Sequence, residues 1–397
     1  MAPESQVVTP AGPVVLITGG AGFIGHALTG MLLKHMDEDG GAGKDAPLAP
    51  SEIRVFDIRR PAFATDPRVV PIIGDVRSLD ALREACRGVD VVLHCAALVD
   101  WGQHPEALVR DVNVTGTRNV IRACTQEGVR ALVFTSTLDV VYEGRPIVDG
   151  DETLPYPGRF TDVYPATKAQ AEQLVLSANG APLVPRPGED GDEAPATLRT
   201  CALRPCGVFG EGDPYHISSF VREAKAGRLL FRIGDGTARY QHVYVGNVAR
   251  AHVLAARSLL QPESAAAGEV YFITDYPAKN FFDYMEPFVC GLGYAMPSKR
   301  RSIPRPVMIA VACMLESLAW LCRPVKRLAL NINRFSVLQL CQDFTFSGEK
   351  AARELGYEPV CTEAEAIVRT LIYFRENGPV RQHVPPDDHR KLPPQRA

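Results

Sequence analysis

A glycine-rich turn near the start of the sequence is the feature that most constrains the fold. The apolar run Val14–Thr18 leads directly into Gly19-Gly20-Ala21-Gly22-Phe23-Ile24-Gly25, and an apolar helical pattern follows. In such a strand, turn and helix, the first glycine permits a tight turn, the second lets the backbone approach a pyrophosphate, and the third allows close helix packing. The sequence therefore predicts a nucleotide-binding unit whose cofactor contacts include Gly19, Gly22, Phe23, Ile24 and Gly25.

Apolar strand-like runs alternate with helical stretches through the first half of the chain. The runs are Val14–Thr18, Ile53–Asp57, Val69–Gly74, Val89–His94, Ala131–Thr135 and Thr200–Arg204. Such alternation is typical of an α/β fold with a Rossmann-type, doubly wound parallel sheet. Past Arg204 the regularity fades, which predicts a smaller C-terminal substrate-binding region over the carboxyl edge of the sheet.

These patterns divide the chain into three parts. We expect a nucleotide-binding core of residues 1–204 plus about 241–263, a substrate-binding region of residues 205–240 and 264–378, and a disordered tail at 379–397. Two stretches rich in Gly, Pro, Ala and acidic residues, Asp37–Ser51 and Gly180–Ala196, are predicted to be loop insertions.

The second predicted strand ends in Asp57, where a carboxylate would accept hydrogen bonds from the adenosine ribose and repel a 2′-phosphate. This favours NAD, although Arg59 and Arg60 keep NADP open. The remaining predicted cofactor contacts follow later strands: Asp75 and Val76 for the adenine amine, the small Ala96 and Ala97, and Pro205.

Tyr164 and Lys168 stand four residues apart and therefore share one face of a helix. A tyrosine titrates near pH 10, and a nearby ammonium favours its phenolate, so the pair suits a general base. Lys168 can also bind the nicotinamide ribose. Ser136 and Thr137 follow the fifth strand, and we favour Thr137 as the hydroxyl that holds the substrate oxygen. The group predicts a dehydrogenase in which Tyr164 takes the alcohol proton as hydride leaves for NAD.

Composition excludes other classes of protein. A net charge of −3 and a pI near 6.3 supply no broad basic face, so we expect no nucleic-acid partner. The ten cysteines form no CxxC pair or zinc-ligand spacing, which indicates no metal site and a reducing compartment. Met1–Pro13 has no basic region followed by an apolar run, so the catalytic part is expected to face the cytosol.

Several further segments make the chain resemble the extended short-chain dehydrogenases, and among them the 3-beta-hydroxysteroid dehydrogenase/delta-5-delta-4 isomerase family. They are 113–120 (NVTGTRNV), 201–205 (CALRP), 209–212 (FGEG) and 243–249 (VYVGNVA). The resemblance implies NAD-linked oxidation of a 3β-hydroxyl on a steroid or sterol by Tyr164 and Lys168. It leaves isomerisation and a homodimer open. Thr137 stands where serine is common in this family, and Asp275 resembles an acidic position implicated in isomerisation, although a turn residue is the alternative.

Val307–Cys322 is an apolar run of 16 residues, interrupted by Glu316 and flanked by basic residues. It is short for a membrane span, which needs about 20 residues. The basic flanks and Trp320 favour a helix lying in a membrane interface, and a buried core helix is the alternative. The resemblance adds endoplasmic-reticulum association, which suits a substrate dissolved in the bilayer.

Three other functions remain open at this point. A decarboxylating sterol-4-alpha-carboxylate 3-dehydrogenase would share the hydride step, and a basic residue facing the 4-carboxylate would distinguish it. A nucleotide-sugar epimerase would share the core machinery but would not need the apolar segment. A noncatalytic nucleotide-binding regulatory protein would keep the fold, but such a protein often lacks the tyrosine or lysine that this chain has at 164 and 168.

Overall fold

Seven parallel strands form the central sheet of the computed structural model, which describes residues 12–37, 48–100, 102–160, 162–186, 196–322, 332–381 and 386. Their order is β11-β7-β5-β4-β1-β2-β3. The strands are β1 (Val14–Thr18), β2 (Glu52–Asp57), β3 (Val69–Ile73), β4 (Val91–His94), β5 (Ala131–Thr135), β7 (Arg199–Pro205) and β11 (Val270–Ile273). The predicted doubly wound parallel fold is confirmed, because the chain winds outward from β1 in both directions.

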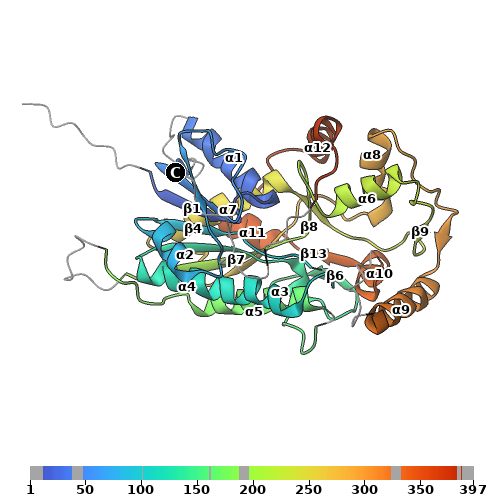
Figure 1. The fold of residues 1–397 in the computed structure, drawn as a ribbon, viewed down its shortest axis with the longest axis horizontal. Coiled ribbons are helices and arrows are strands. Elements are labelled where there is room, and N and C mark those ends of the chain that lie inside the picture. The colour runs from blue at the N-terminus through green and yellow to red at the C-terminus, as the bar shows by residue number, and fades with distance from the viewer. Residues whose placement is uncertain are drawn as a thin grey trace, which may run out of the picture.

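Helices cover both faces of this sheet (Figure 1). Leu16 packs toward one face while Val15 and Ile17 pack toward the other, and all three are fully buried, as expected for a strand covered on both sides. One face carries α1 (Phe23–Asp37), α7 (Val245–Leu260) and α11 (Glu349–Leu355). The opposite face carries α2 (Leu79–Cys86), α4 (Gly116–Gln126) and α5 (Val163–Ser177), and α3 (Glu106–Arg110) runs through a wider turn at 111–115 into α4.

The second region gathers at one end of the sheet, on the right of Figure 1. Its helices are α6 (His216–Lys225), α8 (Phe281–Gly291), α9 (Arg305–Cys322), α10 (Arg334–Leu340) and α12 (Glu363–Asn377). Three short parallel strand pairs tie it together: β8 (Gly207–Phe209) with β10 (His242–Tyr244), β9 (Arg232–Ile233) with β12 (Ser302–Ile303), and β6 (Ile147–Gly150) with β13 (Phe344–Phe346).

The position of β11 shows that the predicted boundary of the substrate-binding region was wrong. Residues 264–378 are assigned above to the substrate-binding region, whereas Val270–Ile273 pairs with β7 as an edge strand of the central sheet. The predicted disordered tail also begins with ordered contacts, because the Val380 amide donates to Ser218 Oγ at 2.9 Å and its carbonyl accepts from Arg222 at 2.7 Å. Most of that tail, and residues 38–47 and 187–195 of the two insertions, lie outside the described residues.

Candidate active site

The glycine turn between β1 and α1 has the geometry that a dinucleotide requires. Gly19 has φ of +70°, and a Cβ there would come within 2.7 Å of the Ala96 backbone. A Cβ on Gly25 would collide with the Gly20 backbone, so α1 starts in direct contact with the turn. Any larger residue at these two positions would displace the backbone that lines the turn.

Asp57 lies at the end of β2, beside the glycine turn. Its carboxylate accepts from the Ala21 amide at 3.0 Å and from the Arg59 amide at 3.0 Å. The Arg59 guanidinium donates to the Ala21 carbonyl at 2.8 Å and lies 3.7 Å from the same carboxylate. Asp57 is therefore held where a ribose hydroxyl would meet it, with one arginine close behind.

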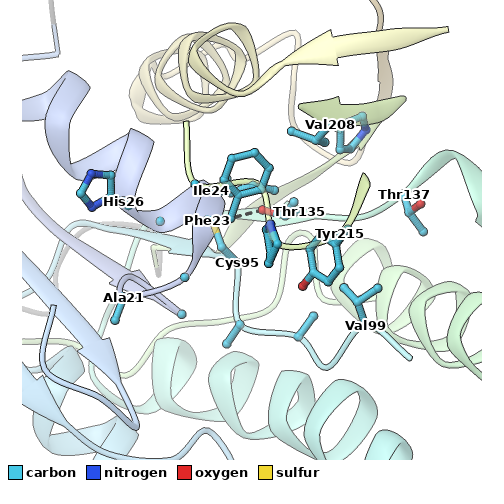
Figure 2. Close-up of a pocket in the computed structure, with 18 of the residues that line it drawn as sticks. Ala21, Phe23, Ile24, His26, Cys95, Val99, Thr135, Thr137, Val208 and Tyr215 are labelled. Atoms are coloured by element: carbon cyan, nitrogen blue, oxygen red, sulfur yellow. Dashed lines mark hydrogen bonds between the residues drawn. The ribbon is translucent and has the colours of Figure 1, made fainter. Parts of the chain in front are cut away.

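A cavity of about 460 Å³ runs along the carboxyl edge of the sheet and brings the predicted site residues together. Figure 2 shows its wall formed by the glycine turn (Ala21, Phe23, Ile24), by Cys95 and Val99 after β4, by Thr135 and Thr137 around the end of β5, by Val208 on β8 and by Tyr215. All the predicted positions line it: Gly19, Gly22, Phe23, Ile24, Gly25, Asp57, Asp75, Val76, Ala96, Ala97, Ser136, Thr137, Tyr164, Lys168 and Pro205. Asp75 reaches it with its carboxylate already paired to Arg77 at 2.8 Å.

Helix α5 places Tyr164 and Lys168 in the cavity wall. The Lys168 ammonium donates to the Thr135 carbonyl at 2.6 Å and lies 4.1 Å from the centre of the Phe134 ring. Burial lowers the pKa of Lys168 to about 7. Burial also raises the pKa of Tyr164 well above its usual value, and the charge of Asp139 adds to this. The expected lowering of the tyrosine pKa is thus opposed by desolvation and by a neighbouring carboxylate.

Two hydroxyls from the end of β5 complete this wall. Thr137 caps the following turn, and its Oγ1 donates to Asp139 Oδ2 at 3.0 Å. Ser136 is buried, and its Oγ has no hydrogen-bond partner within the described part of the chain. A buried hydroxyl without a partner that lines a cavity is suited to bind a ligand group, so the residues present fit a bound dinucleotide and substrate.

The loop after β4 is fixed to α5 by Asn113. Its side chain accepts from the Leu98 amide at 2.7 Å, donates to the Leu98 carbonyl at 3.1 Å and donates to Thr167 Oγ1 at 3.0 Å. Asn113 lies in the wider helical turn at 111–115, a type of irregularity that is frequent at functional sites. Asn113 begins the segment 113–120 that resembles the family. Its hydrogen bonds join the loop after β4 to helix α5, which carries Tyr164, and so set the distance between them.

Asp275 is not brought to the cavity. Its carboxylate accepts from the Tyr244 amide at 2.9 Å, from Asn247 Nδ2 at 2.5 Å and from the Tyr357 hydroxyl, and it does not line the cavity wall. The cavity instead contains Asp139, Tyr215, Tyr240 and Gln339, which the sequence reasoning missed. Asp139 follows Thr137 by two residues. This short spacing between a hydroxyl and an acid is the sequence signal by which Asp139 could have been found.

The parallel sheet, the glycine turn and the Tyr164–Lys168 pair on the wall of one cavity define a short-chain dehydrogenase/reductase. Residues 16–305 match the 3-beta hydroxysteroid dehydrogenase/isomerase family. The chain is 37% identical over 372 residues to 3 beta-hydroxysteroid dehydrogenase type 7 from Homo sapiens, covering 91% of this chain and 95% of that protein. The chain therefore belongs to the 3-beta hydroxysteroid dehydrogenase/isomerase family.

Other relatives and solved structures agree on this fold. The 3beta-hydroxysteroid-dehydrogenase/decarboxylase isoform 1 of Arabidopsis thaliana is 35% identical over 377 residues, covering 90% of this chain and 79% of that protein. The crystal structure of DesIV, a dTDP-glucose 4,6-dehydratase from Streptomyces venezuelae with NAD and TYD bound, superposes with a TM-score of 0.66 at 23% identity and covers 92% of this chain and 97% of that chain. At this identity the structural match shows the fold alone.

Proposed function

We propose that this chain oxidises the 3β-hydroxyl group of a steroid or sterol and uses NAD as the hydride acceptor. The observation that carries the proposal is that Tyr164, Lys168 and Thr137 line the same cavity as the glycine turn and Asp57. Membership of the 3-beta hydroxysteroid dehydrogenase/isomerase family supports the steroid as substrate class.

Each of these side chains has a defined part in the reaction. Bound NAD supplies the acceptor for the hydride that leaves C3. Thr137 binds the 3-oxygen, and Tyr164 takes the hydroxyl proton. Because Asp139 and burial oppose the phenolate, Tyr164 needs positive charge beside it, which Lys168 and the oxidised nicotinamide ring supply. The bond from Lys168 to the Thr135 carbonyl fixes the ammonium in the wall of the cavity.

The test is NADH formation by detergent-solubilised protein given NAD and a panel of 3β-hydroxysteroids and sterols. We expect NADH with at least one member of the panel and none with the 3α-hydroxyl epimers. Silence across the panel, in protein shown to bind NAD, would reject a steroid alcohol as the substrate.

Removing the Asp57 carboxylate should change the choice of dinucleotide. In Asp57→Ala the hydrogen bonds to the ribose hydroxyls are lost while Arg59 remains available to a 2′-phosphate. A charged hydrogen bond contributes about 1.5–3 kcal/mol, so we expect KM for NAD to rise about tenfold or more. The measurement is kcat/KM with NAD and with NADP; an unchanged preference for NAD would place the selectivity elsewhere. Arg60→Ala, at the neighbouring exposed arginine, is the control.

The decarboxylating sterol dehydrogenase is the closest alternative, and one of the relatives carries that activity in its name. Its substrate has a carboxylate on C4, next to the carbon whose oxygen Thr137 would hold. The charged group bonded to Thr137 is another carboxylate, that of Asp139. Like charges in a partly buried site repel, so this geometry favours a substrate without a 4-carboxylate.

Helix α9 supports membrane association as part of the proposal. Within the described residues it is the one helix long and apolar enough to cross a membrane. Met308 and Ala312 pack against the protein, whereas Met314, Leu318, Trp320 and Leu321 are more than half exposed. Its only acid, Glu316, pairs with Arg334 of α10 at 2.6 Å. Helix α9 thus presents an apolar face outward, while its acid is paired with the neighbouring helix α10. This arrangement suits a helix lying in a membrane interface. The predominantly exposed surface argues against the buried core helix.

Replacing Leu318 and Leu321 by glutamine should release the protein from membranes. Each buried leucine contributes about 1.5–3 kcal/mol, so we expect the double variant to bind phospholipid vesicles at least about tenfold more weakly. The matched control is Val368→Gln with Ile372→Gln, which removes two exposed apolar side chains from α12. Equal vesicle binding by wild type and the α9 variant in a flotation assay would reject α9 as the contact.

The location that goes with this arrangement is the endoplasmic-reticulum membrane, with the catalytic part facing the cytosol. Protection of the chain from added protease in sealed microsomes would contradict that orientation. The homodimer left open by the resemblance stays a prediction.

A further inference from the structure

The chain returns to the cavity after helix α12. Tyr373, near the end of that helix, already lines the cavity wall. Gly378 then ends the helix with φ of +68°, a conformation that glycine adopts without strain, and Val380 and Arg381 line the cavity two residues later. Part of the segment that the sequence predicts to be a disordered tail therefore belongs to the wall of the cofactor cavity.

Helix α6 holds this segment in place. The Val380 amide donates to Ser218 Oγ at 2.9 Å, and the Val380 carbonyl accepts from Arg222 at 2.7 Å. Ser218 is fully buried, and its hydroxyl donates to the Asp213 carbonyl at 2.5 Å. Asp213 belongs to the loop at 211–216, most of which lines the cavity. Both backbone groups of Val380 are thus bonded, which fixes the position from which Arg381 leaves.

The loop at 211–216 lies close to the start of α1. Its first residue, Glu211, lines the cavity together with His26, which stands in the first turn of α1. Burial lowers the pKa of His26, and the negative charge of Glu211 acts in the opposite direction, so the two side chains are within electrostatic reach. Val380 and Arg381 are therefore held on the side of the cavity where α1 begins, and this helix N-terminus is where a pyrophosphate is expected.

A second contact of the C-terminal segment lies at the adenine end of the site. The Pro386 carbonyl accepts from Arg77 Nη2 at 2.7 Å. Arg77 follows Asp75 and Val76, which line the cavity, and its guanidinium is paired with the Asp75 carboxylate. In sequence, Arg381 stands between the contact on α6 and the contact on Arg77, so the segment meets the cavity on both sides of the expected pyrophosphate.

The charges of the wall leave one cation available. Among the described lining residues the cations are Arg59, Lys168 and Arg381. Arg59 pairs with Asp57, and Lys168 donates to a backbone carbonyl. Arg381 is exposed and has no hydrogen bond or ion pair with any residue that the structure describes. The wall therefore offers an unpaired guanidinium to a ligand that carries negative charge.

We propose that Arg381 is a dinucleotide-binding residue whose guanidinium pairs with the pyrophosphate. The glycine turn supplies backbone amides and a helix N-terminus but no full positive charge, and Glu211 in the same wall adds a negative one. A planar guanidinium can donate two parallel hydrogen bonds to phosphate oxygens, which suits it to this part. The inference concerns the cofactor and does not depend on which alcohol the protein oxidises.

The test measures dinucleotide binding by the full-length, detergent-solubilised protein in the absence of steroid. Kd for NADH is measured from its fluorescence, and Kd for ADP-ribose and for adenosine from displacement of NADH. We expect Arg381→Gln to raise Kd for NADH and for ADP-ribose by the same factor, about tenfold, because a charged hydrogen bond is lost. Adenosine has no phosphate and should bind both proteins equally. The difference should shrink in about 0.5 M salt, which screens an exposed ion pair.

Three further variants separate the charge from the segment that carries it. Arg381→Lys keeps the positive charge and should recover part of the affinity. Arg222→Met removes the bond to the Val380 carbonyl and should raise both Kd values by a smaller factor. Arg375→Gln is the matched control, because this exposed arginine of α12 donates to the Gly291 carbonyl and does not line the cavity. It should bind NADH as the wild type does.

Several outcomes would overturn the inference. Equal Kd values for NADH and ADP-ribose in wild type and Arg381→Gln would show that Arg381 does not contact the cofactor. A weaker Kd for adenosine as well would show that the segment supports the shape of the site and not the phosphates. A loss confined to NADPH would assign Arg381 to a 2′-phosphate. A protein that binds NADH through Arg381 but oxidises no steroid would reject the proposed function and leave this inference standing.

Discussion

Replacing Tyr164 with phenylalanine is expected to lower kcat for steroid oxidation about a thousandfold, which lies within the range for loss of a general base. The change removes one oxygen and leaves the ring that packs in the cavity wall, so the fold should be unaffected. Lys168 keeps its bond to the Thr135 carbonyl, and the glycine turn is untouched. We therefore expect the Kd for NAD to stay within about threefold of wild type, because Tyr164 acts on the proton and not on the dinucleotide.

Tyr142→Phe is the matched control for this variant. Tyr142 is also buried and also loses a hydroxyl, here one hydrogen-bonded to the Gln342 side chain at 2.9 Å, but it does not line the cavity. It should oxidise steroid at a rate close to that of wild type. Retention of more than about a tenth of kcat in Tyr164→Phe, with normal NAD binding, would show that another group takes the proton.

The sheet was predictable from the sequence because its strands are buried on both faces. A parallel strand covered on two sides gives a short continuous apolar run, and six such runs correspond to six strands of the sheet. Strand β11 escaped because it stands among irregular segments, outside the regular alternation of strands and helices. Its place beside β7 is decided by tertiary packing, which an apolar run alone does not encode.

The parts of the candidate site that could be predicted are those whose positions follow from the Rossmann pattern of strands. Tyr164, Lys168 and the glycine turn are each recognisable from local spacing, and the sheet then brings them to one cavity. Gln339 could not be foreseen, because it comes from 200 residues away and reaches Asp139 only through the packing of α10. The charge of Asp139 was missed for a related reason: its effect on Tyr164 depends on burial, which spacing alone does not reveal.

Breaking the ion pair between Arg204 and Glu172 should have the largest effect on stability. Arg204 of β7 meets Glu172 of α5 at 2.6 Å, the two side chains are 3% and 0% exposed, and Tyr156 donates to the same carboxylate at 2.6 Å. Arg204→Met would leave a buried carboxylate without its cation. We expect the free energy of unfolding to fall by about 3–5 kcal/mol, measured from urea unfolding. This pair also explains the CALRP segment of the family resemblance, because that segment contains Arg204. Its partner Glu172 lies one turn beyond Lys168 on the same helix.

The double variant Arg204→Met with Glu172→Leu distinguishes the cost of an unpaired charge from the value of the pair itself. An apolar replacement of a whole buried ion pair is often neutral for stability, so the double variant should recover most of the lost free energy of unfolding. Its steroid oxidation should nevertheless remain below that of wild type, because the bidentate bond from Arg204 fixes the orientation of α5 and therefore of Tyr164. If the double variant regains stability and full kcat together, the pair serves the fold alone; if it regains stability without kcat, the pair positions the catalytic helix.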